Sequence, residues 1–235
     1  MTVVVNESQR VICDRVFTGS LYAGLPHGDG RPYHTFRTAS VLVTGRDLTF
    51  RRCRFENTAL PPAAAGAARQ AIALYLDGDE IRLEDCVIRS RQDSLFLAPL
   101  PEKEREKDGF LGPRQYEPRL PRTVHLTRCR IEGDVDFVFG GATAYFDECE
   151  FVSLGRGWVF APCTPPGETG FVARGCRFTA AGEVPEASCY VARPWREHAA
   201  VTLEDCTLGP HIHPQIFCGW NEETWPETVR FEIYH

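Results

Sequence analysis

The stretch "LTFRRCRF" at residues 48–55 decides the fold, because its pattern recurs along the chain. Apolar and polar residues alternate, two polar residues break the alternation, and a cysteine and a last apolar residue complete the unit. The same arrangement is found in "IRLEDCVI", "VHLTRCRI", "AYFDECEF", "FVARGCRF" and "VTLEDCTL", so that the repeated cysteines are Cys53, Cys86, Cys129, Cys149, Cys176 and Cys206. An alternation that slips phase by one residue indicates a strand that turns a corner and continues.

The intervals between these units are uneven, from 20 to 43 residues. Loops of different length inserted into a regular coil produce such spacing. A right-handed parallel β-helix stacks repeated coils and buries one column of side chains at each corner. Cysteine suits the column because it is compact and is among the most buried residue types. The pattern therefore predicts an all-β parallel β-helix with a buried cysteine ladder, in preference to a redox or metal site.

Composition predicts a single domain over residues 1–235, because the chain is 43 % hydrophobic and has no abrupt compositional change. The charged run "PEKEREKDG" at 101–109 predicts a solvated loop. A formal net charge of −6 argues against a nucleic-acid partner. No apolar stretch approaches the ~18 residues that a membrane span needs.

The N-terminal residues show neither the basic region nor the apolar run of a signal peptide, which predicts a cytoplasmic location, or a secreted one if an N-terminal segment has been lost. The cytoplasmic location favours reduced thiols, and none of the ten cysteines falls in a C-x-x-C pair of the kind that binds zinc. His211 and His213 have no third ligand nearby at a fitting spacing, so no metal site is predicted.

Polar residues interrupt four otherwise apolar segments. Asp136 lies within "GDVDFVFGG" at 133–141, where a desolvated carboxylate is costly without a partner. The other three segments are "RQAIALYLDGD" with Gln70, "RSRQDSLFL" with Gln92 and Asp93, and "VARPWREH" with Arg193 and Trp195. Taken together, two carboxylates, two amides and one guanidinium form a set suited to acyl transfer at an ester.

In this order and at roughly this spacing, these motifs resemble those of the pectin methylesterase family, over about residues 35 to 232. The resemblance implies a right-handed parallel β-helix that hydrolyses the methyl esters of galacturonate units in pectin, with no metal or organic cofactor. Family members usually have further segments at both ends. We therefore expect both ends of the solenoid to be poorly capped.

The resemblance also implies a role for each polar residue. Asp136 would be the nucleophile, Asp93 the general acid that later acts as base, Gln70 and Gln92 the oxyanion hole, and Arg193 the partner of Asp136. Burial and a neighbouring like charge are expected to raise the pKa of Asp93, while Arg193 keeps Asp136 ionised.

Three aromatic residues correspond to the family's sugar-binding floor. They are Phe137, Trp195 and Trp220, the last within "PQIFCGWN" at 214–221. Asp134 occupies a place that the family fills with small or polar residues, and no catalytic role is assigned to it.

Two other functions fit parts of the pattern. A polygalacturonan glycosidase also needs two carboxylates, but it needs no arginine clamp on either. A non-catalytic pectin-binding β-helix needs aromatic residues, but it has no use for a desolvated nucleophile. Gln70, Gln92 and Arg193 together favour the esterase. The sequence leaves open the oligomeric state and whether the action along the polymer is processive or random.

Overall fold

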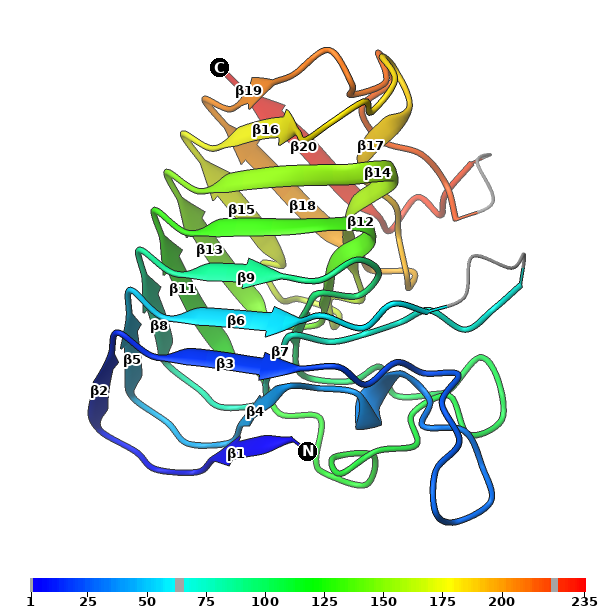
Figure 1. Ribbon diagram of the computed structural model, residues 1–235. Helices are drawn as coiled ribbons and strands as arrows, with labels where there is room; N and C mark the ends of the chain where they lie inside the picture. Colours follow the sequence, from blue (N-terminus) through cyan, green and yellow to red (C-terminus); the bar gives the residue numbers. More distant parts are fainter. Residues whose placement is uncertain (1, 62–65, 221–223) are drawn as a thin grey trace.

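The computed structural model describes residues 2–61, 66–220 and 224–235. The chain forms the predicted right-handed parallel β-helix, whose coils stack from the first at the bottom of Figure 1 to the last at the top. Each complete coil contributes a strand to each of three faces, and all strand pairs are parallel. Within the described residues, no helix is long and apolar enough to cross a membrane.

The first face contains β1 (Val3–Val5), β4 (Val41–Val43), β7 (Leu74–Leu76), β10 (Leu95–Leu97), the C-terminal parts of β12 (Arg130–Gly140) and β14 (Glu150–Pro162), and β17 (Cys189–Ala192). The second contains β2 (Arg10–Cys13), β5 (Leu48–Arg51), β8 (Ile81–Glu84), β11 (Thr123–Thr127), β13 (Thr143–Asp147), β15 (Phe171–Arg174), β18 (Ala200–Glu204) and β20 (Arg230–Tyr234). The third contains β3 (Val16–Gly19), β6 (Arg54–Asn57), β9 (Val87–Arg89), the N-terminal parts of β12 and β14, β16 (Arg177–Ala180) and β19 (Thr207–Leu208). One 3₁₀ turn, η1 (Thr35–Arg37), lies between β3 and β4.

Each repeated unit turns its corner immediately before the cysteine, as the sequence predicts. The residue at that place has a left-handed backbone, with φ between 51° and 57° at Arg52, Asp85, Arg128, Glu148, Gly175 and Asp205. One left-handed residue redirects the chain from the second face to the third, and it shifts the side-chain alternation by one position.

The six cysteines stack at this corner and form the predicted ladder. The amide of Cys53 donates a hydrogen bond to Sγ of Cys86, and the amide of Cys129 donates one to Sγ of Cys149, both at 3.4 Å. Five of the six are buried, and Cys206 is half-buried. None of the ten cysteines forms a disulfide bond within the described residues.

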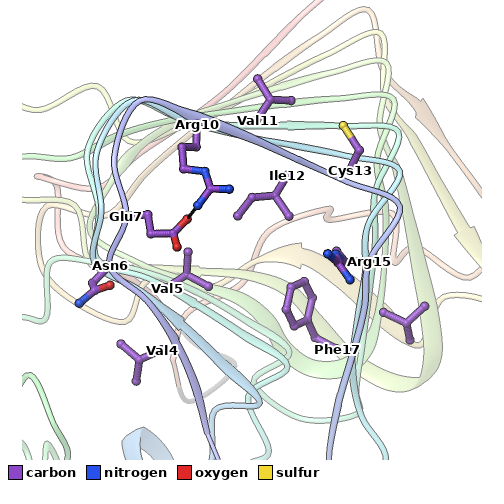
Figure 2. A pocket seen from close by; sticks show the side chains of 11 residues that line it. Val4, Val5, Asn6, Glu7, Arg10, Val11, Ile12, Cys13, Arg15 and Phe17 are labelled. Carbon is purple, nitrogen blue, oxygen red and sulfur yellow. Dashed lines mark hydrogen bonds and ion pairs between the residues drawn. The ribbon is translucent and has the colours of Figure 1, made fainter.

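The interior of the coils is filled by one continuous hydrophobic core, in which rings such as Phe151 and Phe160 pack at 4.9 Å between centroids. At the N-terminal end this interior opens to solvent. Figure 2 shows the side chains of Ile12 and Phe17 pointing into the first coil, where the ion pair of Arg10 with Glu7 lies across the opening.

A second hydrophobic cluster lies outside the coils on the first face. Neighbouring strands align Leu42, Tyr75, Phe96, Phe139 and Ala161 in one outward-facing row. Phe36 of η1 packs on this row, with its ring 4.9 Å from that of Phe96.

The segment 101–121 covers part of this outer cluster. Residues 102–107 are exposed, as predicted for a solvated loop, but Phe110 and Leu111 are buried. Asp77, itself buried, anchors the segment by accepting a hydrogen bond from Nε of Arg114 at 2.5 Å. The charged run is therefore only the outer edge of a structured segment.

Candidate active site

A pocket of about 220 Å³ opens on the first face beside the outer cluster. All five polar residues predicted for the site line it: Gln70, Gln92, Asp93, Asp136 and Arg193. Thr35, Phe36, Gly109, Phe139, Ala161, Trp195 and Trp220 complete the lining. The sequence prediction did not include Thr35, Phe36, Gly109, Phe139 or Ala161.

Stacking of the coils brings these distant residues together. Gln70 precedes β7, and Gln92 and Asp93 precede β10. Asp136 lies within β12, and Arg193 directly follows β17. The strand order β7-β10-β12-β14-β17 places these segments on neighbouring coils. A residue that occupies the same turn in successive coils therefore lies next to its counterparts, whatever the length of the intervening loops.

Asp136 enters the pocket because β12 is irregular there. Its φ is 49°, and the pairing with β14 shifts register between Val135 and Val138. The shift breaks the alternation and sends Phe137, which is fully buried, into the inner core. The prediction of Phe137 as part of the sugar-binding floor is therefore corrected, and Phe139 is the aromatic ring of this strand that lines the pocket.

Arg193 holds the carboxylate of Asp136 with two hydrogen bonds. Its Nε donates to Oδ1 at 2.8 Å and its Nη2 to Oδ2 at 2.5 Å. Paired donation of this kind is the strongest geometry open to a guanidinium and a carboxylate. It supplies the partner charge that a carboxylate in an apolar strand requires.

Two indole rings hold the Arg193 guanidinium in place. Its Cζ lies 3.7 Å from the ring centroid of Trp158 and 4.1 Å from that of Trp220. Trp158 comes from β14, and its Nε1 donates to Sγ of Cys218 at 2.9 Å. The sequence prediction missed Trp158. The one feature that could have identified it is its position on β14, the strand between β12, which contains Asp136, and β17, which Arg193 follows.

Asp93 and Asp136 are buried to similar degrees but lie in different electrostatic surroundings. Burial raises the pKa of Asp93 well above its usual range, and the charge of Asp136 raises it further. Burial also raises the pKa of Asp136, and the hydrogen bonds and charge of Arg193 oppose this rise. Of the two carboxyl groups, Asp93 therefore has the stronger tendency to hold a proton. Asp93, like Asp136, has a left-handed backbone, with φ 64°.

Gln70 and Gln92 provide the amide groups of the pocket. The Oε1 atom of Gln70 is buried and has no hydrogen-bond partner among the residues that the structure describes. Because the oxygen and nitrogen of an amide are assigned from their partners, this group is free to present either atom to a ligand.

Trp195 and Trp220 form the aromatic side of the pocket. The ring of Trp195 lies 5.8 Å from that of Phe139 and 6.4 Å from that of Phe110, between centroids. Residue 221, the last of the segment containing Trp220, lies outside the described residues.

Asp134 does not line this pocket. It is buried, and it pairs with Nε of Arg91 at 2.8 Å. Its charge contributes to the raised pKa of Asp93, after burial and Asp136. In the described part of the chain, no group of three or more His, Cys, Asp or Glu residues lies close enough together to hold a metal ion.

The sequence profile of the family described as Pectinesterase matches residues 20–100 and 122–235. The chain therefore belongs to the pectinesterase family. It is 29 % identical over 93 % of its length to the probable pectinesterase/pectinesterase inhibitor 64 of Arabidopsis thaliana, and 32 % identical over 93 % to the putative pectinesterase/pectinesterase inhibitor 43 of the same plant. It spans only about a third of these relatives, 34 % and 28 % of their lengths.

Solved structures share the fold. Pectin methylesterase PemA from Erwinia chrysanthemi superposes with a TM-score of 0.77 at 20 % identity, over 99 % of this chain and 76 % of that one. A pectin methylesterase from Aspergillus niger gives a TM-score of 0.77 at 22 % identity, over 100 % of this chain and 71 % of that one. A pectin methylesterase in complex with a hexasaccharide gives 0.72 at 18 % identity, over 100 % and 80 %.

The prediction of a cytoplasmic location is wrong. The relatives are plant pectinesterases, and the Aspergillus niger enzyme was crystallised in deglycosylated form with an N-acetylglucosamine stub. Attachment of a glycan to asparagine marks a secreted protein. The family therefore points to an extracellular location.

Proposed function

We propose that this chain hydrolyses the methyl esters of galacturonate units in pectin and releases methanol. One observation carries the proposal. Two buried carboxylates share one pocket, and only Asp136 is clamped by an arginine. Environments that differ in this way assign different protonation states to two like groups, which is how acid and base roles are separated.

In the first half of the reaction an Oδ atom of Asp136 attacks the ester carbonyl carbon. The carbonyl oxygen gains the negative charge, and amide N–H groups of Gln70 and Gln92 stabilise it. As the C–O bond to the methoxy group breaks, Asp93 gives its proton to the departing oxygen and methanol leaves. Asp136 is then joined to the galacturonate carbonyl as an acid anhydride.

In the second half, the Asp93 carboxylate takes a proton from a water molecule, and the oxygen of that water attacks the anhydride carbonyl carbon. The bond to Asp136 breaks, which restores its carboxylate and frees the galacturonate acid. Asp93 again carries the proton. Arg193 stays bound to Asp136 throughout and favours its return as an anion.

Trp195, Trp220 and Phe139 supply the apolar side against which a sugar ring packs. In this proposal residues 1–235 act as one β-helix domain that binds methyl-esterified homogalacturonan. The continuous stack of coils from β1 to β20 supports this arrangement.

The test is an incubation of the purified chain with highly methyl-esterified pectin, measuring methanol and new reducing ends in parallel. Methanol without reducing ends is the expected result. Reducing ends without methanol would show that the chain is a glycosidase and not an esterase. If neither product formed, the remaining interpretation would be a pectin-binding module.

A further inference from the structure

The first coil of the β-helix, formed by β1, β2 and β3, has an uncovered outer side, which we call the open end. Each of these strands pairs only with a strand of the next coil among the described residues. Their other edges therefore carry unpaired backbone groups, which are templates for pairing with another strand. A hollow of about 500 Å³ lies inside the coil and contains the half-buried side chains of Ile12 and Phe17 (Figure 2).

The strands of the open end also expose apolar side chains. In the described part of the chain eight large hydrophobic residues are exposed, and four of them lie on these three strands: Val3, Val4, Val11 and Val16. A concentration of exposed apolar residues on one surface is typical of an interface. The open end therefore has the composition of a surface that another protein covers.

Arg10 occupies an inward-facing position of β2. It pairs in register with Leu48, which is fully buried in the next coil. Nη1 of Arg10 binds Oε2 of Glu7 across the opening, and both side chains are exposed. The other carboxylate oxygen of Glu7 has no hydrogen-bond partner among the described residues. One acceptor at this corner, between β1 and β2, is therefore available to a further donor.

Arg15 takes the place of the ladder cysteine in the first coil. Its carbonyl accepts a hydrogen bond from the amide of Arg54, as the carbonyl of Cys53 accepts one from the amide of Val87. The side chain is exposed, and it forms no ion pair within the described residues. The adjacent Asp14 already accepts two hydrogen bonds, both at 2.8 Å, from an arginine of the next coil. The corner between β2 and β3 therefore carries a cation without a partner.

We infer that the open end binds the open end of a second copy of this chain, with a two-fold axis through β2. A half-turn about this axis reverses the direction of the coil, so that the strands of the two copies meet antiparallel, β2 on β2 and β1 on β3. The same half-turn exchanges the two corners beside β2. The corner with Glu7 in each copy then faces the corner with Arg15 in the other. The charges are thus complementary at both corners, and the two apolar hollows close each other.

Stacking of the open end on the last coil of another copy fits the charges less well. The strand registers would place Arg10 over Phe231 and Arg15 over Cys206, which are an aromatic ring and a thiol. A cation on an apolar column is costly to bury. Such a contact would also leave a free end on every copy, so association would continue into a filament. The two-fold arrangement pairs the charges and closes at two copies.

Sedimentation equilibrium of the purified chain, from about 1 to about 100 µM, tests this inference. Each chain has a mass of 26.4 kDa, and a species of twice that mass that dissociates on dilution is expected. Arg15→Glu and Glu7→Arg each place like charges at both corners, so each should raise the Kd of the dimer at least about tenfold. Arg177→Glu, the same reversal at an exposed residue of β16, is the matched control and should leave the Kd unchanged.

The double variant Glu7→Arg/Arg15→Glu separates this interface from a general effect of charge. It exchanges the two charges, so that opposite charges meet again across the two-fold axis, and the Kd should return to within a few-fold of the wild-type value. Both residues are exposed, and circular dichroism checks that each variant folds. As a second measurement, the midpoint of thermal unfolding should rise with protein concentration in the wild type and not in Arg15→Glu.

A wild-type chain that stays monomeric over this range would overturn the inference. A dimer that neither single reversal weakens would also overturn it, as would a double variant that associates no better than the single ones. Species that grow beyond the dimer with concentration would show head-to-tail stacking and contradict the two-fold arrangement. The inference does not rest on the proposed function, because the pocket of Asp136 contains no residue of the open end. A chain that dimerises as described but releases no methanol would contradict only the proposed function.

Discussion

Arg193 binds both carboxylate oxygens of Asp136, and its guanidinium lies between the indole rings of Trp158 and Trp220. The arrangement fixes the direction in which the carboxylate points and keeps its charge in a buried place. Asp93 in the same pocket has no such partner among the described ion pairs. From this difference follow the predicted effects on activity and on stability.

Replacing Arg193 with glutamine should lower the rate of methanol release about 100-fold or more at neutral pH. Without the guanidinium the pKa of Asp136 rises further, because burial is then unopposed, and the nucleophile takes up a proton. The acid limb of the pH–rate profile should therefore move to higher pH. Arg177→Gln, the same change at an exposed site, should leave the profile in place, and a limb that does not move in Arg193→Gln would contradict the clamp.

The raised pKa of Asp93 predicts a stability effect of opposite sign to the usual one for a carboxylate. Because the folded state holds this proton more tightly than the unfolded chain, the contribution of Asp93 to stability is fully present below the unfolded pKa of about 3.9 and is lost as pH rises toward the folded value. Asp93→Asn removes the titration, so this variant should be more stable than the wild type at neutral pH.

Urea unfolding at acidic and neutral pH measures this effect, with the exposed Asp205→Asn as the matched control. The gain from Asp93→Asn should be larger at neutral pH than at acidic pH. A variant less stable than the wild type at neutral pH would show that Asp93 is ionised and satisfied in the folded state.

Trp195→Ala should raise the KM for polymeric pectin several-fold while the fold is retained. The indole contacts Phe139 and Phe110 at the edge of the pocket, outside the inner core. Its backbone carbonyl, which orients Arg105 and Arg196, is unchanged by the substitution. Trp225→Ala, a change of equal size beside Phe231, serves as the control. Wild-type kinetics for Trp195→Ala would remove this ring from the site.

The cysteine ladder predicts a narrow pattern of thiol reactivity. Cys13 is exposed and should react at once with an aromatic disulfide reagent, and the half-buried Cys206 should react slowly. The other eight are buried and should react only after denaturation. Rapid reaction of several more thiols in the native protein, or a mass that shows disulfides, would contradict the ladder.

The fold could be predicted because its signal is local. Each corner is encoded by a unit of eight consecutive residues. In every unit the residue before the cysteine has a left-handed backbone, and this residue produces the phase slip seen in the sequence. The convergence of Gln70, Asp93 and Arg193 could be predicted for a related reason. In stacked coils, equivalent turns lie side by side.

Other features depended on contacts that no local pattern records. Phe137 was misplaced because the left-handed Asp136 shifts the alternation after it, which is visible only in the backbone. Phe110 packs on the outer hydrophobic cluster, and its segment is anchored by the hydrogen bond from Arg114 to Asp77. These two residues are far apart in the sequence. Trp158 could be recognised as a site residue only once the position of Arg193, which lies over its ring, was known.

The most direct test of the account is methanol release by Asp136→Asn, with circular dichroism and thermal unfolding as checks that the variant folds. The amide preserves the shape of the side chain but cannot attack as a carboxylate, so the rate should fall on the order of 10⁴-fold. Asp93→Asn should also be severely impaired, and the double variant should be little worse than either single one, because the two residues act as a unit. A folded Asp136→Asn that keeps a substantial fraction of the wild-type rate would contradict the mechanism.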